Sequence, residues 1–292
     1  MTAVDGGWML SEPVQEKRPS LLTTKLYIPQ QREAMVSRPQ LMARLQAGLT
    51  RKLTLISAPA GFGKSSLMSA CAAHCGRLVA WLSLDRRDND PARFWAYVIT
   101  ALQTICPGLG QAALERWQQT QSPPGERIFT ELINELVALP EPAVLMLDDF
   151  HVIEAEPVHE GLIFFLTHLP PSLHLVVCGR ADPPWPLARW RVRGEINEIR
   201  AQDLRFNREE TAVFLNRVMA LNLAPEAVAV LDERTEGWAA GLQMAALSMR
   251  DRRDVAGFIA GFSGTNRYIL DYLLAEVLAG QSPEVQHFLL HT

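Results

Sequence analysis

The sequence predicts an α/β fold in which a parallel sheet flanked by helices is followed by an all-helical region. Two apolar runs of strand length carry the prediction, because each ends in residues that bind phosphate or metal in such sheets. Residues 53–57 lead into a glycine-bearing loop and a helix-forming segment, and residues 142–147 end in Asp148 and Asp149. From Asn207 onward the pattern changes to one helix after another.

Length and composition bound the class of protein. The chain has 292 residues, enough for about two domains, and 48% of them are hydrophobic. Its formal net charge of −4 gives no basic excess for nucleic acid or an anionic membrane. No apolar run reaches membrane-span length, no secretory signal begins the chain, and the four cysteines form no disulfide-like framework. We expect a cytoplasmic protein with no membrane partner.

The loop at 58–66 predicts a nucleotide site of the P-loop type, with Ala58 where the strict pattern has its first glycine. Gly61 and Gly63 suit a backbone that approaches phosphates closely, and a helix beginning near Lys64 directs its positive end at them. Lys64 can reach the β- and γ-phosphates, and the Ser65 hydroxyl can bind Mg²⁺. A ligand-free glycine turn is the alternative. The predicted cofactor-binding residues of the loop are Ala58, Ala60, Gly61, Phe62, Gly63, Lys64, Ser65 and Ser66.

The strand that ends in two carboxylates predicts the metal-binding and catalytic end of the site. Asp148 fits the Walker B role and would hold Mg²⁺ directly or through water. Asp149 stands where many P-loop ATPases carry a glutamate that polarises the attacking water. Its side chain is one methylene shorter, so we expect any hydrolysis to be slow. Solvated acids at a strand end are the alternative.

The segments before the first strand predict a loose tail over 1–20, an extended stretch over 21–29 and a helix over 40–48. Such segments often wrap around the base in nucleotide switches, which makes Arg38 a candidate contact for adenine or ribose. A solvated arginine before a proline is an equally good interpretation.

The remaining pattern predicts strands at 78–84, 173–178 and 195–199, helices at 91–105 and 128–139, and a polar loop at 118–125. Arg180 follows the strand at 173–178 and is a candidate sensor of the γ-phosphate, unless it binds a nearby acid such as Asp182. Helices are predicted at 208–221, 224–235 and 238–249, with further helical segments to residue 292. The arginines Arg189, Arg191 and Arg193 indicate either a solvated face or a basic interaction surface.

Six stretches resemble the nucleotide-binding module of STAND-type ATPases, and more closely that of large bacterial LuxR-type transcription activators of the maltose-regulator kind. They are residues 57–66, 145–151, 179–184, 199–206, 235–243 and 268–273. The resemblance covers about residues 21–292. Alanine in the P-loop is usual for this kind of regulator. Gln243 departs from other STAND branches, which carry a lid proline near the adenine.

The resemblance implies an ASCE-type P-loop sheet, a helical lid and the start of a winged-helix arm. We divide the chain accordingly into a tail (1–20), a nucleotide-binding domain (21–206), a lid (207–254) and a truncated arm (255–292). In such proteins ADP holds a resting monomer, and inducer and ATP permit self-association. The inducer and promoter DNA bind to modules that we expect to lie outside this chain, which ends abruptly.

The sequence therefore predicts a signalling module that binds ATP or ADP with Mg²⁺ and hydrolyses slowly. The first alternative is a metabolic P-loop kinase or ATPase acting on a small molecule, for which no acceptor base beyond Asp149 is evident. The second is a nucleotide-stabilised scaffold without hydrolysis. Turnover separates the three interpretations, since kinases work at roughly 1–100 s⁻¹.

Overall fold

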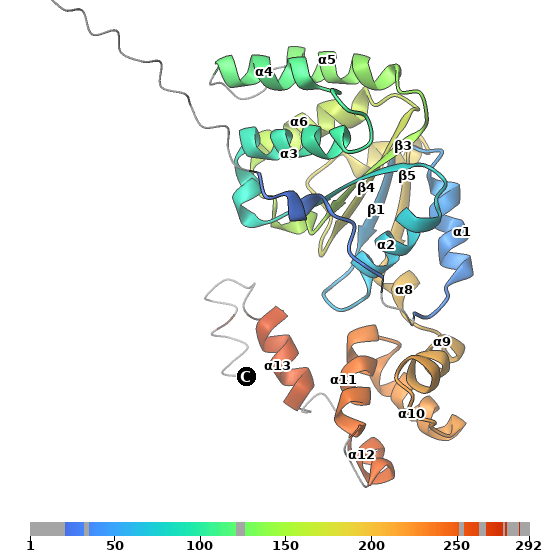
Figure 1. Cartoon of the computed structure of the whole chain (residues 1–292). Helices are drawn as coiled ribbons and strands as arrows, with labels where there is room; N and C mark the ends of the chain where they lie inside the picture. The colour runs from blue at the N-terminus through green and yellow to red at the C-terminus, as the bar shows by residue number, and fades with distance from the viewer. Residues whose placement is uncertain are drawn as a thin grey trace, which may run out of the picture.

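The computed structural model describes residues 21–31, 35–120, 126–250, 254–262 and 267–276, together with Leu278 and Gln286. The expected tail (1–20) and the polar loop from residue 121 lie outside the described residues. A five-stranded parallel sheet lies between two layers of helices, and a second group of helices lies beyond one end of the sheet (Figure 1). The predicted parallel sheet with flanking helices is confirmed.

The sheet and its covering elements have the following bounds. The strands are β1 (Leu53–Ser57), β2 (Leu78–Ser83), β3 (Ala143–Asp148), β4 (Leu173–Gly179) and β5 (Ile196–Arg200). The helices around them are α1 (Pro39–Gly48), α2 (Lys64–His74), α3 (Pro91–Gln103), α4 (Gln111–Thr120), α5 (Glu126–Val137), α6 (Glu156–Thr167), α7 (Leu187–Val192) and α8 (Ala201–Leu204). Short 3₁₀ turns are η1 (Thr23–Leu26), η2 (Arg86–Asn89) and η3 (Phe150–Val152).

The strand order β2-β3-β4-β1-β5 determines which loops meet. β4 pairs with both β1 and β3, so it lies between the strand before the P-loop and the strand that ends in Asp148. Ser57 is in register with Gly179, and Leu147 with Val177. All strands are parallel, so the loops after β1, β3 and β4 leave the same edge, where ligands bind in such sheets.

Alternation along the strands produces two cores, one on each face of the sheet. On β3, Leu145 and Leu147 join the core under α3, α5 and α6, whereas Val144 and Met146 join the core under α1 and α2. Since both faces are covered, β3 carries an unbroken run of buried residues, as parallel strands do. The apolar run that predicted this strand thus reflects burial on both sides.

Two elements differ from the sequence prediction or were not assigned by it. Helix α4 continues to Thr120, so the polar loop expected from residue 118 begins later. Helix α6 fills a stretch for which no element was predicted, and its buried residues Val158, Leu162, Phe165 and Leu166 recur at helical spacing.

The first lid helix is shorter than the predicted 208–221. Helix α9 (Arg208–Val213) passes into a π-helical turn, η4 (Phe214–Val218), and the chain then leaves the helix. The Asn216 side chain bonds both the N–H and the carbonyl of Leu223, at 2.7 and 3.1 Å. Ala220 and Asn222 have left-handed backbone conformations. These local bonds replace the expected last helical turn.

The helices beyond the sheet share a single core. They are α9, α10 (Pro225–Thr235), α11 (Ala239–Met249), α12 (Val255–Gly261) and α13 (Arg267–Glu276). Leu215, Leu231 and Leu242 form its centre, and Ile259 of α12 and Ile269 of α13 pack into the same cluster. The division proposed at residue 254 therefore does not coincide with a separate core and stays a prediction.

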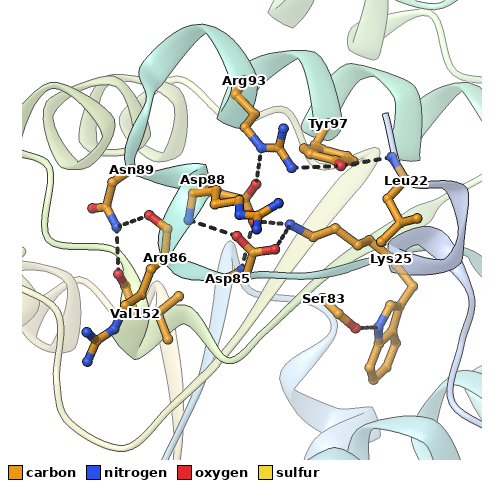
Figure 2. Close-up of polar contacts among 12 residues, drawn as sticks. Leu22, Lys25, Ser83, Asp85, Arg86, Asp88, Asn89, Arg93, Tyr97 and Val152 are labelled. Carbon is orange, nitrogen blue, oxygen red and sulfur yellow. Dashed lines mark hydrogen bonds and ion pairs between the residues drawn. The ribbon is translucent and has the colours of Figure 1, made fainter. Parts of the chain in front are cut away.

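A buried charge cluster anchors the N-terminal segment beside β2 (Figure 2). Asp88 has no exposed surface and binds the Lys25 ammonium on one side and Arg93 Nε, at 3.0 Å, on the other. The Leu22 N–H donates to the Tyr97 hydroxyl at 3.0 Å. Because both cations bind the same buried carboxylate, removal of Asp88 would leave Lys25 and Arg93 without their shared partner. This cluster fixes where the chain begins its path toward α1.

The Asn89 side chain connects this cluster to the turn that follows β3, the strand that ends at Asp148. Its amide nitrogen donates to the Val152 carbonyl at 2.8 Å, and its oxygen accepts the Glu154 and Ala155 N–H groups at 2.7 and 2.9 Å. The turn that follows Asp148 and Asp149 is thereby held from outside the sheet.

Candidate functional site

The loop at 58–66 has the backbone geometry that phosphate binding requires. Gly63 adopts φ +76° at the N-cap of α2, a left-handed conformation that a glycine reaches without strain. A Cβ on Gly63 would meet nothing within 4 Å, so conformation and not crowding favours glycine there. No side chain caps the start of α2, so its first N–H groups are left without a side-chain acceptor. They can therefore bind an anion.

Lys64 is the buried cation of this loop. Its side chain reaches back into the loop, where Nζ donates to the Pro59 carbonyl at 2.9 Å. Burial lowers the pKa of Lys64, and the neighbouring Arg180 acts in the same direction, while Asp149 and Asp148 oppose it. A polyanion bound at the loop would offset the cost of burying this cation, because the phosphate oxygens would supply the negative counter-charge.

Asp148 lies at the buried end of β3 and contacts two neighbouring elements. The Ser65 hydroxyl from α2 and the Cys178 thiol from β4 lie close enough to its carboxylate to lower its pKa. Burial raises the pKa of Asp148, and the charge of Asp149 adds to this effect. A hydroxyl and a carboxylate in contact at the phosphate loop are the oxygen ligands that Mg²⁺ takes beside a nucleotide, so the predicted pair Ser65 and Asp148 fits this ion.

Asp149 has a left-handed backbone, with φ 55°, that turns its side chain toward solvent. Its N–H donates to Asp148 Oδ1 at 3.0 Å, which holds the two acids in a fixed relation. Non-glycine residues with positive φ are uncommon and cluster at functional sites, and aspartate tolerates this conformation. The carboxylate is half-exposed, and its role toward water stays a prediction.

His151 lies next to Asp149, although the sequence analysis did not select it. Its Nδ1 is 3.9 Å from Asp149 Oδ1 and, within the part of the chain described, has no hydrogen-bond partner. Burial lowers the pKa of His151, with Arg180 contributing, so the ring is neutral near pH 7. The end of β4 lies close to this residue: a Cβ on Gly179 would be 3.4 Å from the backbone nitrogen of His151.

Arg180 reaches across the site to α13. Its guanidinium donates to the Glu276 carboxylate at 2.7 Å and also to the Glu276 backbone carbonyl. Asp182, the alternative partner considered from sequence, instead binds Arg200. Arg180 is close enough to Lys64 to influence its pKa, so it lies at the expected edge of the sheet. Its role as a sensor stays a prediction.

The lid helices contact the P-loop directly. The Ala240 N–H donates to the Gly61 carbonyl at 3.0 Å, and Trp238 Nε1 donates to the Ala60 carbonyl at 3.1 Å. A Cβ on Gly61 would lie 2.5 Å from the Ala240 Cβ and 2.9 Å from the Tyr272 hydroxyl. The sequence analysis assigned Gly61 to close approach by phosphate, but the structure shows that the lid also requires a glycine there.

Arg38 is engaged by the protein itself. Its guanidinium binds Glu210 and the carbonyls of residues 203–205 at 2.8–3.1 Å. An adenine contact by Arg38 therefore stays a prediction that would compete with these bonds. Gln243, the other uncertain position, lies half-buried on α11.

The remaining predicted residues divide between the loop and the surface. Ala58 and Ala60 are buried, Phe62 packs on the core under α2, and Ser66 is exposed in the first turn of α2. The arginines considered for a basic surface, Arg189, Arg191 and Arg193, are exposed.

Sequence reasoning missed the residues that come from other elements. Cys178, Trp238 and Tyr272 contact the loop or Asp148 only because the fold brings β4, α11 and α13 there. His151 carried a signal, since it follows Asp148 by three residues in one of the motif stretches. Trp238 and Tyr272 also lie in motif stretches, 235–243 and 268–273, whereas Cys178 lies in none of them.

A family model described as AAA ATPase domain matches residues 32–178, about half of the 292-residue chain. The match includes the P-loop, the strand ending in Asp148 and most of β4. This chain belongs to the AAA ATPase domain family. The AAA ATPase match thus covers β1, β2, β3 and most of β4, and it includes Lys64, Ser65 and Asp148, whereas β5 lies outside it.

Relatives extend the similarity into the helices beyond this core. The chain is 36% identical over 274 residues to the HTH-type transcriptional regulator MalT of Cronobacter sakazakii and 34% identical to that of Serratia proteamaculans. Each match covers 92% of this chain and 30% of the relative. The chain thus spans about a third of the relatives' length, and the predicted resemblance to the maltose-regulator kind is confirmed.

A solved structure supports the same fold. A signal transduction ATPase with numerous domains (STAND) from Pyrococcus horikoshii, which carries a tetratricopeptide repeat sensor, superposes with a TM-score of 0.56. It is 17% identical, and the match covers 80% of this chain and 32% of that chain. Among the described helices of this chain, none combines the length and apolar character needed to cross a membrane.

Proposed function

We propose that this chain is the nucleotide-binding switch module of a bacterial transcriptional activator. It binds ADP or ATP through the P-loop and Arg180, with Mg²⁺ at Ser65 and Asp148. The observation that supports a switch most strongly is the direct bonding of the lid to the P-loop. Because Ala240 and Trp238 bond the loop backbone, a change in the ligand of the loop changes the contacts of the lid.

The activator role is supported by the MalT regulators, whose length this chain spans in part. By analogy, the complete protein acts in the cytoplasm, self-associates in its ATP state, and binds its inducer and promoter DNA through other modules. Hydrolysis is slow and resets the switch, with Asp149 orienting the attacking water. When bound, Mg²⁺ would neutralise phosphate charge, while Lys64 and Arg180 hold and orient the phosphates.

The experiment compares Lys64→Ala with Lys52→Ala in a titration with a fluorescent ADP analogue. Lys64→Ala removes a charge-assisted contact of about 1.5–3 kcal/mol, which weakens ADP binding by roughly 10- to 150-fold. Lys52 precedes β1 at the opposite end of the sheet and binds Glu195 and the Thr167 carbonyl. Its removal should leave affinity unchanged. Equal affinities of Lys64→Ala and the unmodified protein would refute the nucleotide site.

A second measurement separates the switch from a metabolic kinase. Single-turnover and steady-state hydrolysis of Mg-ATP should be far below the roughly 1–100 s⁻¹ of kinases. The nucleotide that copurifies with the protein, identified after denaturation, should be ADP or ATP. Turnover in the kinase range that depends on a small-molecule acceptor would overturn the switch.

A further inference from the structure

Arg38 is bound entirely within the junction between the sheet and the lid. Its Nη1 donates to the Leu204 carbonyl at 2.8 Å, and Nη2 donates to the Asp203 and Arg205 carbonyls at 3.1 and 2.8 Å. These carbonyls end α8, which lies between the sheet and the lid helices (Figure 1). A guanidinium at the carboxyl end of a helix satisfies acceptors that the helix leaves open and complements its dipole.

The same guanidinium also binds the beginning of the lid. Arg38 Nε donates to Glu210 Oε1 at 3.1 Å, with both side chains mostly buried. Glu210 Oε2 accepts the Asn207 N–H at 3.0 Å, and Asn207 in return caps α9. The guanidinium stacks over the Phe206 ring at 5.3 Å. One planar fork thus joins the last helix of the sheet domain to the first helix of the lid, which a lysine could not do.

The junction continues to the P-loop through a short series of contacts. The Phe206 N–H donates to the Gly237 carbonyl at 2.8 Å, and Arg205 donates to the Glu236 carbonyl at 2.8 Å. Gly237 has φ +68°, and a Cβ there would lie 2.2 Å from the Phe206 oxygen. The next residue, Trp238, bonds the P-loop. The backbone of 203–206 therefore determines the position of the turn at 236–238, and with it the position of Trp238 and α11 against the P-loop.

We infer that Arg38 is a positioning residue that fixes the junction at 203–206 and thereby holds the lid on the P-loop. The inference rests on the proposed nucleotide switch and assigns Arg38 a role other than contact with the base. An arginine that already donates to four acceptors would have to give up bonds in order to reach adenine. Nucleotide retention then depends on a residue that does not touch the nucleotide.

The test uses Arg38→Met and Arg38→Lys in the full chain, with Arg51→Met as the matched control. The Arg51 guanidinium also donates to a backbone carbonyl, but this carbonyl belongs to Ile196 at the start of β5, away from the lid. Release of a fluorescent ADP analogue should be faster in both Arg38 variants, by roughly 5- to 150-fold, the usual range for coupled sites. The control should release ADP at the unmodified rate.

Hydrogen exchange on nucleotide-free protein separates positioning from base contact. Loss of positioning should speed exchange of the amides at 237–241 in both Arg38 variants, while β1 at 53–57 keeps its protection. Glu210→Gln removes the charged partner of Arg38 and should produce a smaller change in the same direction, which keeps the test valid if Arg38→Met folds poorly.

Two outcomes overturn the inference. Unchanged ADP release in the Arg38 variants excludes a positioning role. Faster release with unchanged exchange at 237–241 in nucleotide-free protein would instead indicate direct contact with the nucleotide. If the unmodified protein binds no ADP analogue, the proposed function fails, and that result is distinct from both.

Discussion

Arg180 at the end of β4 and Glu276 in α13 are paired through both the side chain and the backbone carbonyl of Glu276. The two residues are 96 positions apart, and their pairing joins the edge of the sheet that carries the candidate site to α13. Tyr272, one turn earlier in α13, lies against the P-loop at Gly61. Helix α13 therefore contacts the candidate site at two points, one charged and one through the loop backbone.

Weakening the charged contact should speed nucleotide release. Glu276→Gln removes the ionic part of the pair and keeps the backbone bond. Since both side chains are about a third to a half exposed, at 35% and 45%, the contact is worth at most about 1 kcal/mol. We expect ADP release to be faster by up to about fivefold. Glu160→Gln, an exposed α6 position, removes the same charge elsewhere; equal release rates for the two variants would contradict the prediction.

Asp149→Asn should slow hydrolysis and leave Mg-ATP bound. The substitution keeps the shape and the left-handed backbone, which asparagine also tolerates, but it removes the charge that orients water. General-base effects of this kind contribute about 10²- to 10⁴-fold to a rate. Single-turnover hydrolysis and ATP affinity measured on the same preparation test the prediction. An unaltered cleavage rate would exclude Asp149 as the group that acts on water.

Asp148→Asn should weaken the magnesium dependence of nucleotide binding and stabilise the nucleotide-free fold. Burial raises the pKa of Asp148, so the folded state holds this proton more tightly than the unfolded state does. The free energy of unfolding therefore falls as pH rises from the pKa of the unfolded state, about 3.8–3.9, to the raised pKa of the folded state. The neutral amide of asparagine does not ionise and avoids this loss. Urea unfolding at pH 7 without nucleotide tests the expected gain in stability. Mg²⁺ titrations at fixed ADP test the magnesium dependence. A nucleotide-free Asp148→Asn variant that is less stable than the unmodified protein would contradict the expected gain in stability.

His174 should make the fold lose stability in acid. The buried ring, with its pKa lowered to about 4, donates from Nδ1 to the Arg51 carbonyl and accepts at Nε2 from the Thr54 hydroxyl. The unfolded state, with a pKa near 6.5, binds the proton more readily, so stability falls as pH drops from about 6.5 to 4. The shift corresponds to a loss of about 3 kcal/mol.

Comparison with His174→Gln isolates this contribution, because other histidines titrate in both proteins. The variant should be less stable at pH 7, since it cannot satisfy both partners of the ring. Its unfolding free energy from urea melts should nevertheless change less between pH 7 and 4. Identical pH slopes in the two proteins would show that His174 does not govern the acid response.

The chemistry of the predicted site could be inferred from the sequence because each of its central parts is local. The P-loop needs a strand, a glycine-bearing loop and a helix start within a few residues, and Lys64 and Ser65 have their positions from that spacing alone. The run of apolar residues at β3 required burial on both faces, which placed Asp148 and Asp149 at the ligand-binding edge of a parallel sheet. Local backbone chemistry and hydrophobic pattern were sufficient for these conclusions.

What holds the site closed was decided only by tertiary structure. Arg38 and Glu210, Arg180 and Glu276, and Gly61 and Ala240 are each separated by more than ninety positions, so no spacing rule relates them. Arg38 had equally good interpretations as a base contact or a solvated residue, and its binding to the carbonyls of residues 203–205 follows from how α1 packs beside α8. Contacts of this kind depend on the relative placement of whole elements, because many packed side chains together determine where each helix lies.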